Sequence, residues 1–195
     1  MRWLAYRYLK IRGWTFDGEL PDVRKVVIIG APHTSNWDFV FFLGVIYFLG
    51  IRPKVLGKHT LTRKPFGGLM RRLGVIPVRR DVAGNTVERV KDAFVAADEM
   101  MLVIAPEGTR ARAEYWRSGF YKIALGADVP LLMAAIDGGR KRVKISAPMD
   151  LTGEVGPDMD MIRLFFDGWH GLKPEQRTPV RLRDEGAEYP RQPGT

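Results

Sequence analysis

Short apolar runs, separated by segments of helical character, are the feature that most limits what this chain can fold into. Each run is four to seven residues long and is bounded by Gly, Pro or charged residues, which is typical of buried strands. The predicted strands are Val26–Gly30, Lys54–Gly57, Val75–Val78, Met101–Ala105, Pro130–Ile136 and Val143–Ser146. Strands that alternate with helices predict an α/β fold, with a largely parallel or mixed central sheet flanked by helices.

Start signals locate two of the helices. Asn85 and Glu88 have the spacing of a capping box, and apolar residues recur behind them with helical spacing. Ser35 and Asp38 provide a second start signal, ahead of an apolar segment that continues to Leu49. A helix is therefore expected just after the first predicted strand and another before the fourth.

Length and local composition divide the chain into three parts. A chain of 195 residues favours one domain with one site. Residues 1–20 form an aromatic and basic segment that we expect to be amphipathic and suited to a membrane interface, or alternatively to pack as a helix on the domain's own core. Residues 21–170 carry the predicted strands and form the domain, and residues 171–195 read as a polar, Pro-rich tail that is extended or disordered.

The positive charge of the chain is concentrated in one stretch. The formal net charge is +9, and residues 51–80 contain nine basic residues and no acidic one. These residues are Arg52, Lys54, Lys58, Arg63, Lys64, Arg71, Arg72, Arg79 and Arg80. Such a block predicts an anionic partner, which could be a phosphate, coenzyme A, acyl carrier protein, an anionic bilayer or nucleic acid.

Several classes of protein are excluded by what the sequence lacks. Without cysteine there is no disulfide framework and no thiolate nucleophile, which fits the cytoplasm. The longest mostly apolar run, residues 39–51, is too short to cross a bilayer, and no signal peptide is recognisable. Signatures of nucleotide-binding loops, serine hydrolases and zinc proteases are missing, and three scattered histidines predict no metal site.

The first candidate catalytic pair is His33 and Asp38. His33 is predicted in a strand-to-helix turn, where ligands bind in open α/β sheets. Asp38 lies five residues further along, one helical turn into the predicted helix, and can accept the proton on one imidazole nitrogen. The other nitrogen is then held as a general base for a hydroxyl group.

The second candidate constellation is an anion cradle in residues 106–110, a P-E-G-T-R sequence that follows a predicted strand. Its Pro and Gly predict a tight turn with exposed N–H groups, and Arg110 can bind a phosphate with two hydrogen bonds. Arg79 or Arg80, just past another strand, could join it on the same phosphate. The candidate substrate-binding residues are Glu107, Gly108, Thr109, Arg110, Arg79 and Arg80, with Lys58 and Lys64 as further anion contacts.

In this order and spacing the motifs resemble the glycerolipid acyltransferase family, which includes 1-acylglycerol-3-phosphate acyltransferases. The four blocks are matched by His33 with Asp38, by Gly74, Ile76 and Arg80, by residues 106–110, and by Val129 with Pro130. The resemblance implies transfer of a fatty acyl group from acyl coenzyme A or acyl carrier protein to the hydroxyl of a lysophospholipid such as 1-acylglycerol-3-phosphate. It also implies no bound metal or cofactor. The integral members have N-terminal membrane helices that this sequence lacks, so we expect a peripheral location on the inner face of the membrane.

Two alternatives remain open at the level of sequence. Ala111 stands where many members have Ser, and Pro32 where many have Asn, so the acceptor could be a lyso-ornithine lipid, another lysolipid, or a non-lipid alcohol or amine. The chain could also be a non-catalytic basic module that binds an anionic membrane or nucleic acid, which explains the charge but not the paired motifs. No aromatic RNA-binding signature is present, so we expect no nucleic-acid partner.

Overall fold

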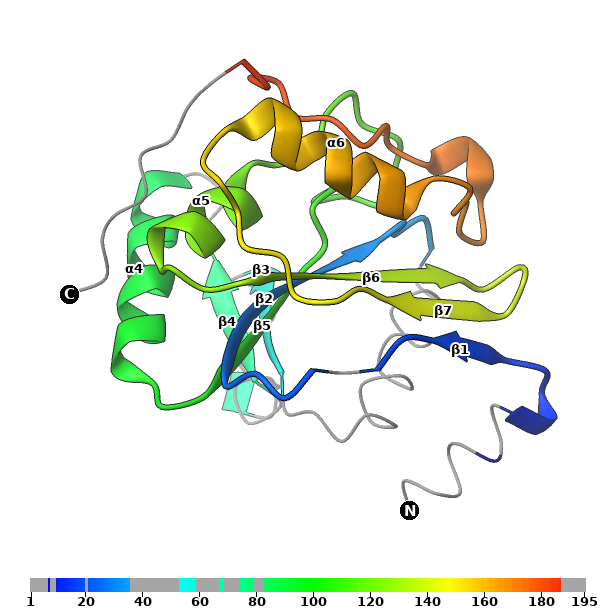
Figure 1. Cartoon of the computed structure of the whole chain (residues 1–195), viewed down its shortest axis with the longest axis horizontal. Coiled ribbons are helices and arrows are strands. Elements are labelled where there is room, and N and C mark those ends of the chain that lie inside the picture. The colour runs from blue at the N-terminus through cyan, green and yellow to red at the C-terminus, as the bar shows by residue number, and fades with distance from the viewer. Residues whose placement is uncertain are drawn as a thin grey trace.

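The computed structural model of the chain describes residue 7 and residues 10–19, 21–35, 53–58, 67–68, 74–78 and 83–186. A seven-stranded sheet with the order β1-β7-β6-β2-β5-β3-β4 forms its centre (Figure 1). Neighbouring strands are parallel, except that β6 and β7 are antiparallel. The strands are β1 (Thr15–Asp17), β2 (Lys25–Ala31), β3 (Lys54–Lys58), β4 (Val75–Val78), β5 (Met100–Ile104), β6 (Leu131–Asp137) and β7 (Arg142–Ile145). The predicted α/β fold with a mixed, largely parallel sheet is confirmed.

The apolar runs locate the strands well. All six predicted strands are present, with each end within one residue of the prediction, whereas β1 was missed because its three residues are mostly exposed. The described helices are α4 (Ala83–Ala96), α5 (Gly119–Gly126), α6 (Val155–Phe166) and the 3₁₀ turn η2 (Pro174–Gln176). The helix predicted from Asn85 is α4, which begins two residues earlier. The helix predicted after His33 lies outside the described residues.

Both faces of β2 are buried, as expected for a central strand of a parallel sheet. Val27 and Ile29 belong to an apolar cluster that includes side chains of α4, α5 and α6. Val26 and Ile28 belong to a second cluster, on the other face, together with Trp14. The three helices thus cover one side of the sheet, as Figure 1 shows.

A buried carboxylate fixes the first turn of α6. Asp158 is 2% exposed and accepts hydrogen bonds from the hydroxyl of Tyr121 in α5, at 2.6 Å, and from the N–H and hydroxyl of Thr152, each at 3.0 Å. A buried charge is tolerated only where such bonds replace its water shell. The network therefore ties α6 to α5 and to the loop that precedes it.

The chain after α6 turns back across the domain. We call residues 171–185 the C-terminal strap; in Figure 1 it is orange to red and runs back past α6. Thr178, Val180 and Leu182 of the strap are buried, and the last two belong to the helix-covered core. The expected extended or disordered tail is thus corrected for this part of the chain. Its backbone is irregular, but alternate side chains face inward and complete the core.

Residues near the N-terminus also belong to the domain. Trp14 is 6% exposed, and β1 extends the sheet by parallel pairing with β7. The sheet and core therefore take in residues on the N-terminal side of the predicted boundary at residue 20. Within the described part of the chain, no helix has the length and apolar character needed to cross a membrane.

Candidate functional site

The two candidate turns leave the sheet at the same edge. β2 ends at Ala31 and is followed by His33, while β5 ends at Ile104 and is followed by the turn of residues 106–110. Ile29 pairs with Ile104 in parallel register, so the two turns emerge from adjacent strand ends. The carboxyl-terminal edge of a parallel sheet is where ligands bind in open α/β folds.

The Glu107 carboxylate joins these two turns. Its Oε2 accepts a hydrogen bond from the backbone N–H of His33 at 2.6 Å, and the residue is only 2% exposed. A backbone N–H bound to a carboxylate forms a charge-assisted bond, which exclusion of water strengthens. Sequence reasoning grouped Glu107 with the phosphate-binding residues, but in the structure its carboxylate holds the backbone of the candidate base.

The turn of residues 106–110 is tight, as its Pro and Gly predict. Gly108 has a φ of +66°, a conformation that favours glycine, and its N–H donates to the carbonyl of Ala105 at 3.1 Å. The hydroxyl of Thr109 accepts a hydrogen bond from the N–H of Ala111 at 3.2 Å. Thr109 and Arg110 are exposed, so this side of the turn is accessible to a ligand.

Arg117 is a further cation at this turn that the sequence analysis did not single out. Its N–H donates to the carbonyl of Pro106 at 2.7 Å, and its Cγ lies 3.1 Å from the point that a Cβ on Gly108 would occupy. The stem of Arg117 thus covers Gly108. Only its positive charge marked it in the sequence, because its place over the turn depends on contacts with residues nine and eleven positions earlier in the chain.

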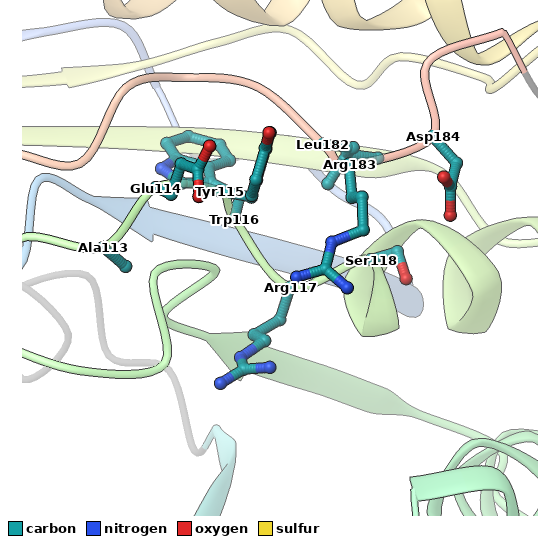
Figure 2. Close-up of a pocket in the computed structure, with 9 residues that line it drawn as sticks. All are labelled: Ala113, Glu114, Tyr115, Trp116, Arg117, Ser118, Leu182, Arg183 and Asp184. Atoms are coloured by element: carbon teal, nitrogen blue, oxygen red, sulfur yellow. The ribbon is translucent and has the colours of Figure 1, made fainter.

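Arg117 also lines a cavity of about 340 Å³ between residues 113–118 and 182–184 (Figure 2). The cavity carries charges of both signs, because Glu114 and Asp184 accompany Arg117 and Arg183. Hydrogen bonding to Glu114 and the charge of that residue raise the pKa of the Tyr115 hydroxyl above its ordinary value. Such a mixture of charges does not select an anionic ligand.

Four predicted site residues lie outside the described part of the chain: Asp38, Lys64, Arg79 and Arg80. Lys58 is the last residue of β3 and pairs in parallel register with Val78, the last residue of β4. β3 in turn is parallel to β5. The chain therefore leaves β3 and β4 at the edge where His33 and Glu107 follow β2 and β5.

The C-terminal strap contacts the His33 turn on its other side. Thr34 is 1% exposed, and its hydroxyl accepts a hydrogen bond from the N–H of Lys173 at 3.1 Å. With its amide oriented to satisfy its neighbours, the side-chain nitrogen of Gln176 donates to the carbonyls of Thr34, at 2.8 Å, and Arg110, at 2.9 Å. No sequence signal pointed to these contacts, because two of the acceptors are backbone carbonyls, which every residue has.

The other histidines do not extend the site. His170 is half-buried at the end of the loop that follows α6, and His59 lies outside the described residues. Among the residues that the structure describes, no three His, Asp or Glu side chains are grouped so that they could hold a metal ion.

Comparison with known proteins gives one family and one solved structure. The acyltransferase family profile matches residues 15–137, from β1 to the end of β6. No curated protein matches the chain. The fold is similar to that of the 1-acyl-sn-glycerophosphate (LPA) acyltransferase PlsC from Thermotoga maritima, with a TM-score of 0.50, 20% sequence identity, and coverage of 76% of this chain and 67% of that one.

Proposed function

Because the chain belongs to the acyltransferase family, we propose that it moves a fatty acyl group from acyl coenzyme A or acyl carrier protein to the hydroxyl of a lysophospholipid such as 1-acylglycerol-3-phosphate. The observation that carries the proposal is the hydrogen bond between His33 and Glu107, which joins one residue of each motif across 74 positions of the chain. The name of the Thermotoga protein, whose fold is similar, agrees with this acceptor.

In the proposed mechanism His33 is the general base. Its imidazole takes the proton of the acceptor hydroxyl while that oxygen attacks the thioester carbonyl. A C–O bond forms, the C–S bond breaks, and the imidazolium gives its proton to the leaving thiolate, so the products are an ester and a free thiol. Asp38 has the role of holding the imidazole tautomer, and no acyl-enzyme is required.

Basic groups of the candidate motifs would bind the acceptor's phosphate. Arg110 supplies a planar fork for two phosphate oxygens, and the N–H groups of the turn add further donors. The remaining proposed contacts are Gly108, Thr109, Arg79 or Arg80, Lys58 and Lys64. Binding of the phosphate there would hold the acceptor hydroxyl close to His33, so that the reacting groups no longer have to meet by diffusion.

We further propose that the enzyme works as a peripheral protein on the inner, cytoplasmic face of the membrane. Both substrates have an apolar and a polar part, so the enzyme would meet the acceptor at the surface of a bilayer. The nine basic residues of the 51–80 stretch, without an acidic neighbour in it, favour an anionic lipid surface.

The test is acyl transfer by the purified protein from acyl coenzyme A, and separately from acyl carrier protein, to lysophosphatidate in detergent or vesicles. Diacylated product is expected, with a loss of about 10²–10⁴-fold in His33→Ala, the usual contribution of a positioned base. His170→Ala is the matched control and should retain activity, because no proposed step uses that side chain.

The choice of acceptors makes the result decisive. Product from a lyso-ornithine lipid, another lysolipid, or a non-lipid alcohol or amine, but not from lysophosphatidate, would correct the acceptor and leave the base in place. No product from any acceptor with either donor would contradict the proposal.

A further inference from the structure

One side chain of the C-terminal strap lies between the two turns that form the candidate site. With its amide oriented so that the nitrogen faces the two acceptors, Gln176 donates to the carbonyl of Thr34, next to His33, and to the carbonyl of Arg110, the last residue of the P-E-G-T-R sequence. The two distances are 2.8 and 2.9 Å, so both hydrogen bonds are of ordinary length. Gln176 is therefore in contact with both turns at once.

We propose that Gln176 is a positioning residue for acyl transfer, which holds the His33 turn and the Arg110 turn at a fixed separation. The proposal rests on the function proposed above for these turns. Its two hydrogen bonds go to the backbone carbonyls of Thr34 and Arg110, so Gln176 acts through the backbone of the two turns.

The chemistry of the contact explains why an amide is suited to this position. Two carbonyl oxygens that face the same point are both acceptors and cannot bond to each other. A hydroxyl has one proton to donate, whereas the side-chain amide of Gln176 has two on a single nitrogen. One uncharged group can therefore satisfy both carbonyls without bringing a cation close to the phosphate-binding residues.

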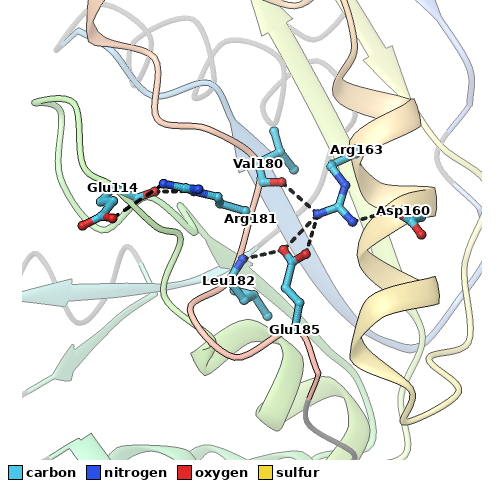
Figure 3. A network of polar contacts seen from close by, with 7 residues as sticks. All are labelled: Glu114, Asp160, Arg163, Val180, Arg181, Leu182 and Glu185. Carbon is cyan, nitrogen blue, oxygen red and sulfur yellow. Dashed lines mark hydrogen bonds and ion pairs between the residues drawn. The ribbon is translucent and has the colours of Figure 1, made fainter.

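The part of the strap that follows Gln176 is itself held by hydrogen bonds to other parts of the domain. The guanidinium of Arg177 donates to the carbonyl of Phe166 at 2.9 Å, and the hydroxyl of Thr178 accepts a hydrogen bond from the N–H of Ala113 at 3.0 Å. Further on, Arg163 of α6 donates to both carboxylate oxygens of Glu185, each at 2.9 Å (Figure 3). These bonds fix the backbone from which the Gln176 side chain projects.

A fixed separation matters because the base and the phosphate ligand act on the same substrate. If the phosphate is bound near Arg110, the distance between the two turns sets how well the acceptor hydroxyl meets His33. A misplacement of about 1 Å can lower a rate by about 10²-fold. Glu107 links the turns from the core side, and Gln176 links them from the strap.

The experiment compares Gln176→Leu with Glu175→Leu, its exposed neighbour in η2, in the full chain. The first removes both donors at similar volume, and the second controls for a new leucine in the same turn. Amide hydrogen exchange, which needs no substrate, should become faster in residues 31–35 and 106–111 of Gln176→Leu alone. At saturating substrates, and well below the unfolding temperature, kcat should fall about tenfold in Gln176→Leu, and Glu175→Leu should match the wild type.

Gln176→Glu allows a further measurement, the pH dependence of kcat, which would match that of the wild type if Gln176 only stabilised the fold. Its ionised carboxylate would face two carbonyls as a third acceptor, which raises its pKa, whereas the protonated acid can donate to one of them. The ratio of its kcat to the wild-type kcat should therefore rise as the pH is lowered from about 8 to about 5. For Gln176→Leu the same ratio should stay level.

Three results would overturn the proposal. Unchanged exchange in both segments would show that Gln176 does not hold the turns, whatever the acceptor is. Faster exchange with an unchanged kcat would show that the separation does not matter for transfer. An inactive wild type would remove the proposed function and the catalytic role of Gln176 with it, while the exchange data would still show whether Gln176 joins the turns.

Discussion

Glu107 of the P-E-G-T-R motif could have either of two roles: it could bind the acceptor, or it could hold the His33 turn in place. As a ligand for the acceptor it would have to face solvent, and its negative charge would repel a phosphate. As a structural partner it needs a backbone donor within reach, and the N–H of His33 is one, at 2.6 Å. The 2% exposure of Glu107 favours the second explanation.

We therefore expect Glu107→Ala to lower kcat by about 10²-fold while the KM for the acceptor changes little, because the proposed base, His33, moves and the proposed phosphate ligands remain. Glu107→Gln keeps an oxygen that can accept the His33 N–H and should lose less. Steady-state kinetics with both substrates varied would show the difference, and exposed Glu114→Ala serves as the control. A large increase in the acceptor KM with unchanged kcat would instead indicate direct binding by the carboxylate.

At the level of elements, the segment that leads from α6 into the C-terminal strap packs against the His33 turn. Gly171 has a φ of +73°, and a Cβ placed on it would lie 2.9 Å from Oγ1 of Thr34 and 3.0 Å from Cγ of Pro32. Gly168, with a φ of +72°, has nothing within 4 Å of the same point. The chain thus offers two glycines with nearly the same φ and different surroundings.

Gly168→Ala should cost about 1–2 kcal/mol of unfolding free energy, the cost of a left-handed residue with a side chain, and leave kcat as in the wild type. Gly171→Ala should cost more and also lower kcat, because its methyl group displaces Thr34 and the adjoining base. Urea unfolding and transfer assays on both variants check this. Equal effects of the two substitutions on kcat would mean that the strap does not act on the turn.

For the whole molecule, burial explains what the sequence could and could not predict. Strands buried on both faces, such as β2, leave apolar runs, and these predicted the mixed sheet and put each motif just after a strand. β1 is short and mostly exposed and leaves no such run. The motifs identified His33 and residues 106–110 as candidate site residues. The role of the strap could not be predicted, because Gln176 and Lys173 bond to residues that become their neighbours only in the folded chain.

The net charge leads to a prediction for the intact protein. With a formal charge of +9, binding to vesicles that contain anionic lipid should weaken steeply as salt is raised, since screening shortens the range of the attraction. Cosedimentation with anionic and with purely zwitterionic vesicles would measure it. Equal, salt-independent binding to both would assign the attachment to apolar contacts and not to the basic stretch.

The sequence distance across the strap contact also sets an order of events during synthesis. The Lys173–Thr34 hydrogen bond joins residues 139 apart, whereas the Glu107–His33 bond joins residues 74 apart. Because the chain is made from its N-terminus, the carboxylate that bonds to the His33 turn is translated well before Lys173 and Gln176. A nascent chain that stops short of residue 173 therefore carries every family motif and still lacks the strap residues that bond to Thr34 and Arg110.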